Sequence, residues 1–256
     1  MLGGEVIPRN CLTNDIKDDT FDALCLHVGL RRWGAWLMPD CSLYGVVLAA
    51  GLSTRAGRFK MELPLGGRTI VEHTVLGMVD VVDRIIVVGG HRAERLSEIL
   101  QGCEKVEVVT NERYPLGMFT SVQTGLRRVR EIARASAPSL TTKGAVGSGF
   151  AVFLQPGDIP LVDKKTYRTL LETPGGVVIP TCDGRKGHPV LIAAQWIEAI
   201  LAEPDTSNLR DFIQRAGYVT VEVEDEGIVL DVDDPDDYRR VLERWANGTP
   251  GKDTTA

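Results

Sequence analysis

The chain has 256 residues, of which 43% are hydrophobic and 25% charged, the balance of a globular protein with a sizeable core. Its formal net charge of −6 and pI near 5.3 argue against a nonspecific nucleic-acid-binding protein, whose surface would be basic. No apolar run reaches the ~18 residues of a membrane span, and no secretory signal begins the sequence, so no membrane partner is expected. Five widely spaced cysteines without a C-x-x-C pair favour reduced thiols, and we expect a cytoplasmic protein.

The domain organisation changes near residue 44. Residues 1–43 mix Pro, Asn, Asp and Gly with short apolar clusters, and we interpret them as an N-terminal extension of unknown role. A single main domain is expected over residues 44–246, and a flexible polar tail over residues 247–256.

Within the main domain, short β-branched runs alternate with amphipathic stretches. This pattern predicts a three-layer α/β/α sandwich around a mostly parallel, Rossmann-like sheet. Ligands of such sheets bind at the carboxyl ends of the strands, so we expect the chemistry after the first, third and fourth strands. The predicted strands are 45–49, 84–88, 106–110, 151–155, 176–180, 190–192 and 219–224. The predicted helices are 69–79, 92–100, 119–134, 164–172, 194–202, 208–216 and 235–245.

The most informative segment is LAAGLSTRAGRFK, residues 48–60, which begins at the end of the first predicted strand. Its glycines free backbone N–H groups to face an anion, and Arg55 and Lys60 can neutralise a triphosphate. It is not a Walker A loop, because no lysine followed by Ser or Thr closes it, and it is not G-x-G-x-x-G. The segment therefore predicts a nucleotide triphosphate site of another kind, the alternative being an ordinary surface loop.

Two later segments place carboxylates where a metal could bind. The run FLQPGDIPL, residues 153–161, puts Asp158 at the carboxyl end of a strand, where it is suited to hold Mg²⁺ or, alternatively, to cap a turn. The run DVDDPDDY, residues 231–238, has the features of a helix N-terminus. That interpretation leaves Asp231 and Asp233 unexplained, since they precede the cap with side chains on one side of an extended segment.

Two further runs are weaker signals. In GMFTSVQTGL, residues 117–126, the hydroxyls fit a helix cap, and a helix N-terminus there would also attract phosphate. In GHPV, residues 187–190, the lone His188 is most often structural or solvated.

Taken in this order, the motifs resemble those of the MobA-like nucleotidyltransferases over roughly residues 44–245, and most closely the MocA-type molybdenum cofactor cytidylyltransferases. Residues 48–60 are similar to the signature L-A-A-G-x-S-x-R-M-G-x-x-K, with Ala56 in place of Met. The resemblance implies Mg²⁺-dependent transfer of CMP from CTP to a molybdopterin-type cofactor, with release of pyrophosphate, for an apo-molybdenum hydroxylase. The choice of CTP rests on L-A-A-G at residues 48–51, because guanylyl members read L-A-G-G.

The resemblance also implies the roles of individual residues. Catalysis is expected from Lys60, Arg55 and Asp158, and the metal site from Asp158 with Asp231 or Asp233. The acceptor is expected to contact His188. The expected nucleotide-binding residues are Leu48, Ala49, Ala50, Gly51, Ser53, Gly117 and Ser121.

Two alternatives stay open. The first is a nucleotidyltransferase that uses GTP or another phosphorylated acceptor, such as a sugar phosphate, methylerythritol phosphate or phospholactate. The second is a non-catalytic accessory protein that binds the cofactor for a molybdenum hydroxylase. The presence of Lys60, Asp158 and Asp231 favours an enzyme.

Overall fold

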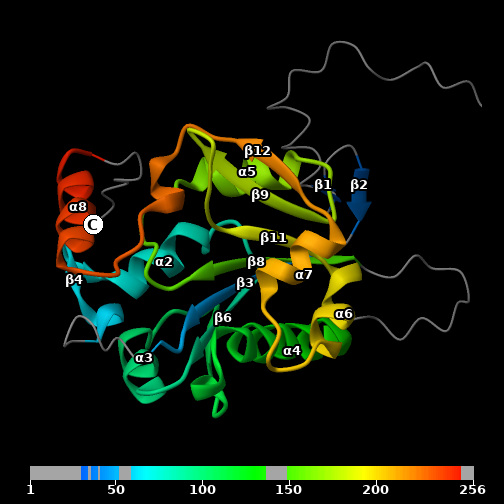
Figure 1. Ribbon diagram of the computed structural model, residues 1–256, viewed down its shortest axis with the longest axis horizontal. Helices are drawn as coiled ribbons and strands as arrows, with labels where there is room; N and C mark the ends of the chain where they lie inside the picture. Colours follow the sequence, from blue (N-terminus) through cyan, green and yellow to red (C-terminus); the bar gives the residue numbers. More distant parts are fainter. Residues whose placement is uncertain (1–29, 34–35, 40, 52–58, 137–148, 249–256) are drawn as a thin grey trace, which may run out of the picture.

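The computed structural model describes residues 30–33, 36–39, 41–51, 59–136 and 149–248. Within them a central sheet crosses the molecule with helices on both faces, so the predicted α/β/α sandwich is confirmed (Figure 1). The strand order is β10-β9-β11-β8-β3-β6-β7, with β12 paired to β9. The strands are β3 (Ser42–Ala49), β6 (Arg84–Gly89), β7 (Val106–Thr110), β8 (Phe150–Pro156), β9 (Val177–Cys182), β10 (Arg185–Lys186), β11 (Val190–Ala193) and β12 (Val219–Glu222).

The strands at the centre of the sheet run parallel, whereas the part of the sheet beyond β8 is mixed. Strand β3 runs parallel to β6 and β8, and β6 runs parallel to β7. Strand β11 runs antiparallel to both β8 and β9, while β12 runs parallel to β9. The carboxyl ends of β3 and β8 therefore meet at one edge, where the sequence predicts the chemistry.

Successive apolar side chains of β3 point to opposite faces of the sheet and contribute to a hydrophobic core on each face. Val47 and Ala49 pack against α2 (Ile70–Met78), α3 (Ala93–Ile99) and α5 (Lys164–Glu172). Val46 and Leu48 pack on the other face, against a second set of helices. That set is α4 (Met118–Ser136), α6 (Ile197–Ala202) and α7 (Leu209–Ala216).

A third apolar cluster fixes the last helix, α8 (Pro235–Ala246), at the side of the sandwich (Figure 1). Its buried members are Leu65, Ile70, Leu161, Val232 and Val241. As the sequence predicts, Asp234 caps this helix, accepting hydrogen bonds from the backbone N–H groups of Asp236 and Asp237. The cluster sets the position of the acidic segment that precedes the helix.

Several elements differ from the sequence-based expectation. The predicted extension contains the paired strands β1 (Leu30–Trp33) and β2 (Trp36–Pro39), and β3 begins at Ser42. The short hairpin of β4 (Pro64–Leu65) and β5 (Arg68–Thr69) was not predicted. The helix expected at 194–202 begins with a 3₁₀ turn, η3 (Ala194–Trp196). In the described part of the chain, no helix combines the length and apolar character needed to cross a membrane.

Candidate active site

A cavity of about 390 Å³ opens at the carboxyl ends of β3 and β8. We call it the first cavity. It collects most of the predicted nucleotide-site residues that the structure describes. Ala49 instead belongs to the core, with 1% of its surface exposed, and Ser53 and Arg55 lie outside the described residues. The first cavity is lined by Leu48, Ala50, Gly51, Lys60, Met61, Tyr114, Pro115, Gly117, Met118, Ser121, Pro156 and Asp158.

Lys60 joins the first motif to the last. It begins the 3₁₀ turn η1 (Lys60–Glu62), and only 11% of its side chain is exposed. Its Nζ donates a hydrogen bond to Oδ1 of Asp233 at 2.6 Å and lies 3.8 Å from Oδ2 of Asp158. The ammonium group is therefore held between carboxylates from two distant parts of the chain.

Three hydrogen bonds to its backbone, two from backbone N–H groups and one from a side chain, fix the segment that carries Asp158. The Gly157 N–H donates to the Leu48 carbonyl at 2.8 Å, and the Thr74 hydroxyl donates to the Gly157 carbonyl at 2.8 Å. The Val232 N–H donates to the carbonyl of Asp158 itself at 3.1 Å. These bonds place Asp158 beside the nucleotide loop and bring the acidic segment before α8 next to it.

The Asp158 carboxyl is costly to ionise. Burial raises its pKa to about 6; the positive charge of Lys60 opposes the shift, and the negative charges of Asp231 and Asp233 add to it. Burial, with the charge of Asp233, also raises the pKa of Asp231. A cation bound here would relieve a charge that the fold by itself destabilises.

The carboxylates can be tested against a magnesium ion. Among the described residues, no three His, Cys, Asp or Glu side chains are grouped to hold a metal by themselves. Mg²⁺ does not require such a group, because it usually takes one or two carboxylates together with substrate phosphates and water. Asp158 and Asp231 offer oxygen donors only, and Asp233 already accepts from Lys60. Asp158, which lines the first cavity, therefore fits a magnesium ion that arrives with a nucleotide, whereas Asp231 lines a different cavity beside Cys182 and Arg240.

Two residues that the sequence did not single out shape the wall of the first cavity. Asn111, 2% exposed, follows β7, and its Nδ2 donates to the hydroxyls of Thr120 and Ser121 at 2.9 Å. Gly90 follows β6, and a Cβ there would lie 2.9 Å from the Ala50 carbonyl oxygen. The sequence signal that could have identified both residues is the position of an Asn and a Gly directly after parallel strands.

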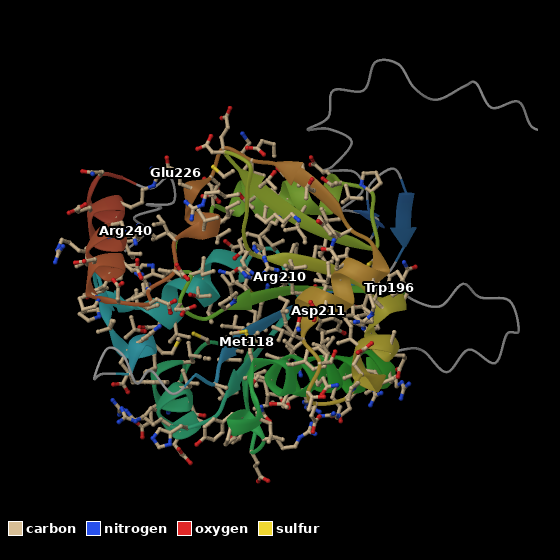
Figure 2. The ribbon with its side chains drawn as sticks, in the orientation of Figure 1. Met118, Trp196, Arg210, Asp211, Glu226 and Arg240 are labelled. Atoms are coloured by element: carbon tan, nitrogen blue, oxygen red, sulfur yellow. The ribbon has the colours of Figure 1, made fainter. Side chains whose placement is uncertain are left out.

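A second cavity, of about 540 Å³, adjoins the first and shares Leu48, Met118 and Pro156 with it. Met118 lies toward the middle of the view in Figure 2, as does Arg210 from α7. The remaining lining residues come from α4, β8, β9, β11, α7 and the turn around β10. They are Phe119, Val122, Leu154, Ile179, Lys186, Gly187, His188, Val190, Asn208, Leu209, Arg210, Ile213, Gln214 and Tyr218.

His188, the predicted acceptor residue, lines the second cavity and not the first. Burial lowers its pKa to about 4, opposed by a hydrogen bond to the Leu154 carbonyl, so the imidazole is neutral at pH 7. Its Nδ1 is buried and has no hydrogen-bond partner among the residues described. The side chain can accept from an N–H group but cannot neutralise a phosphate.

Position 187, directly before His188, requires a glycine because a larger side chain would collide with Ile228. A Cβ at Gly187 would lie 2.4 Å from the Ile228 carbonyl oxygen and 2.6 Å from Ile228 Cγ1. Gly187→Ala is therefore expected to lower the free energy of unfolding by about 1–3 kcal/mol, the usual range for overpacking. Thermal melting checks this, with Gly67→Ala as control, since no atom lies within 4 Å of a Cβ there. Equal melting temperatures for the two variants would contradict it.

Comparison with known proteins identifies the family to which the chain belongs. The family model of the MobA-like NTP transferase domain matches residues 45–221. The molybdenum cofactor cytidylyltransferase of Escherichia coli is 29% identical over 207 residues, covering 80% of this chain and 96% of that protein. A probable molybdenum cofactor guanylyltransferase of Mycobacterium ulcerans is 33% identical over 66% of this chain and 80% of its own length. A nucleotidyl transferase structure from Methanothermobacter superposes with a TM-score of 0.64 at 25% identity, covering 80% of this chain and 98% of that one.

Proposed function

Since the chain belongs to the MobA-like NTP transferase family and is a nucleotidyltransferase, we propose that it transfers CMP from CTP to a molybdopterin-type cofactor with Mg²⁺. The similarity to the E. coli cytidylyltransferase spans most of both chains, which supports this acceptor. The run L-A-A-G at residues 48–51 supports CTP over GTP.

The observation that carries the proposal is the position of Lys60 and Asp158. Both line the first cavity beside the nucleotide loop, with Lys60 Nζ 3.8 Å from the Asp158 carboxylate. An acceptor phosphate oxygen would form the new bond to the α-phosphorus as the bridging P–O bond breaks and pyrophosphate leaves with the electron pair. Such a reaction depends on positioning and charge neutralisation, and no proton acceptor is needed for an already ionised phosphate. Lys60 would stabilise the charge on the α-phosphate, and Arg55 that on the leaving pyrophosphate.

Asp158 and Asp231 are the proposed magnesium ligands, because Asp233 is hydrogen-bonded to Lys60. The ion, when bound, would supply positive charge to the triphosphate. The loop at residues 48–51, Ser53, Gly117 and Ser121 would hold the nucleotide.

The second cavity is the proposed site for the part of the acceptor beyond its phosphate. Its walls are largely apolar, and the neutral His188 suits a polar but uncharged group. A ring system with few polar groups fits this largely apolar lining better than a sugar, which carries a hydroxyl on most of its carbons.

The test is pyrophosphate release with CTP, GTP, ATP and UTP in turn, each with Mg²⁺ and the molybdenum-loaded molybdopterin cofactor. We expect release with CTP alone. Release with GTP alone would keep the reaction and overturn the base assignment, and turnover with a sugar phosphate would replace the acceptor. Stoichiometric cofactor binding with no pyrophosphate from any nucleotide would favour a non-catalytic accessory protein.

A further inference from the structure

Asn111 is a buried polar residue beside the first cavity, and the proposed reaction gives it no role. It directly follows β7, and only 2% of its surface is exposed. Its backbone N–H donates to the Gly89 carbonyl at 2.8 Å, which ties it to the end of the neighbouring strand β6. Its side-chain amide is hydrogen-bonded to three further groups, so this one residue connects the end of β7 to the start of α4.

The hydrogen bonds of the Asn111 amide have a defined direction. Its Oδ1 accepts from the backbone N–H of Arg113 at 3.0 Å, so the NH₂ group is the end that faces α4. The Nδ2 atom donates to the hydroxyls of Thr120 and Ser121, both at 2.9 Å. Because an amide nitrogen only donates, both hydroxyl oxygens are acceptors in these bonds.

The two hydroxyls differ in where their own protons can go. Thr120 is fully buried, and its Oγ1 can donate to the Gly117 carbonyl at 2.9 Å or to the Arg113 carbonyl at 3.0 Å. The Ser121 hydroxyl donates to no group among the residues that the structure describes. Ser121 lines the first cavity, whereas Thr120 does not. The network therefore leaves the Ser121 proton to be donated to an acceptor in the cavity.

Asn111 holds this hydroxyl on the side of the cavity away from the charged pair. Lys60 and Asp158 are the proposed contacts of the reacting phosphate, and Asp158 follows β8. In the order β8-β3-β6-β7, the ends of β8 and β7 are three strand spacings apart, about 14 Å. The lining on the β7 side comes from the turn η2 (Tyr114–Leu116) and the start of α4, and it carries no charged group. A nucleotide whose α-phosphate lies at Lys60 would therefore place its nucleoside on this side.

We propose that Asn111 is a positioning residue for the nucleoside part of the substrate. It fixes the Ser121 hydroxyl as a donor, directed at an acceptor atom of the nucleoside. This role rests on the proposed function, since it assumes that a nucleotide occupies the first cavity with its phosphates at Lys60. It deepens that function by naming the residue that sets the direction of one nucleotide contact.

The test is a double-mutant cycle on CTP binding to the full chain, measured by calorimetry with Mg²⁺. Ser121→Ala removes the donor and is expected to raise the Kd about two- to ten-fold, the usual net contribution of one hydrogen bond. Asn111→Asp is expected to raise it at least as much, because a carboxylate only accepts and takes the Ser121 proton from the ligand. In the Ser121→Ala background, Asn111→Asp should change the Kd by less than about two-fold, since the group through which Asn111 acts is gone.

Thr120→Val is the matched control, because Thr120 accepts from the same Nδ2 but does not line the first cavity. It should lower the melting temperature and leave the CTP Kd as in wild type. Two further ligands separate the parts of the nucleotide. CMP keeps the nucleoside and should show the same loss as CTP in Ser121→Ala and Asn111→Asp. Tripolyphosphate keeps only phosphates and should bind Ser121→Ala as it binds wild type.

Wild-type CTP affinity in Asn111→Asp, or an equal loss in both backgrounds, would overturn the role of Asn111 and leave the proposed function standing. An equal loss of tripolyphosphate and CTP affinity in Ser121→Ala would assign the hydroxyl to a phosphate and overturn the nucleoside contact. A wild-type protein that binds no nucleotide would overturn the proposed function and this role together.

Discussion

Lys60→Ala is expected to lower kcat about 10²–10³-fold, the cost of removing one preorganised charge contact from a transition state. The ammonium group lies between Asp158 and Asp233 at the edge of the first cavity, so it is already in place before substrate binds. Its loss also removes the charge that lowers the pKa of Asp158. The Mg²⁺ concentration needed for half-maximal rate should therefore rise as well, because a protonated carboxyl binds the ion poorly.

The measurement is steady-state pyrophosphate release across a magnesium titration. Lys164→Ala is the matched control, because Lys164 forms a similar 2.6 Å pair with Asp80 on an exposed surface away from the cavity. Circular dichroism should show both variants folded. A wild-type rate in Lys60→Ala would remove Lys60 from the mechanism.

Asp158→Asn is expected to abolish most turnover and yet to stabilise the metal-free protein at pH 7. The folded-state pKa of Asp158 is about 6, above its ordinary 3.8, so the ionised carboxylate opposes folding at neutral pH. Removing that charge should raise the free energy of unfolding by about 1–3 kcal/mol, each pKa unit corresponding to roughly 1.4 kcal/mol.

The size of this effect depends on pH. The raised pKa favours the folded wild type below pH 4, and this advantage is lost as the pH rises through 6. The stability difference between Asp158→Asn and wild type should therefore be largest at pH 7 and shrink toward pH 4. Thermal melting in EDTA across this range measures it. Mg²⁺ with CTP should raise the melting temperature of wild type more than that of the variant.

Asp80→Asn provides a control of opposite sign. A hydrogen bond from Lys164 lowers the pKa of Asp80, so removing this carboxylate is not expected to stabilise the protein at pH 7. A destabilised Asp158→Asn at neutral pH, or a difference that grows toward pH 4, would contradict the buried-charge interpretation.

The layered fold could be predicted because each central strand is a short, largely apolar run between amphipathic helical stretches. The strand predicted at 106–110 is observed as Val106–Thr110, and the helix at 164–172 as Lys164–Glu172. The direction of β11 could not be predicted in this way. It follows from pairing with β8 and β9, where Leu191 faces Phe153 and Val178, and such partners leave no local signal. Strand β10 consists of Arg185 and Lys186 alone, too short for any pattern.

The same difference between local sequence signals and contacts between distant segments applies to the candidate site. Motif order was enough to choose Lys60 and Asp158, and both line the first cavity. Local spacing could not reveal that Lys60 pairs with Asp233, because that contact depends on how α8 packs against the sandwich. The role of Asn111 was missed for a related reason, since its partners in α4 become neighbours only once β7 and α4 are placed. The assignments of Ser53 and Arg55 stay predictions, because both lie outside the described residues.

The hydrogen bond between Lys60 and Asp233 spans 173 positions of the chain, and it has a consequence for synthesis. A ribosome-bound chain that already contains β3 and β8 has the nucleotide loop and Asp158, but the acidic segment before α8 is still to be made. Because a domain generally folds as a unit, the site is not assembled until that segment has been made. The full set of charges, Lys60 with Asp158 and Asp233, can therefore form only in a chain that has been synthesised as far as α8.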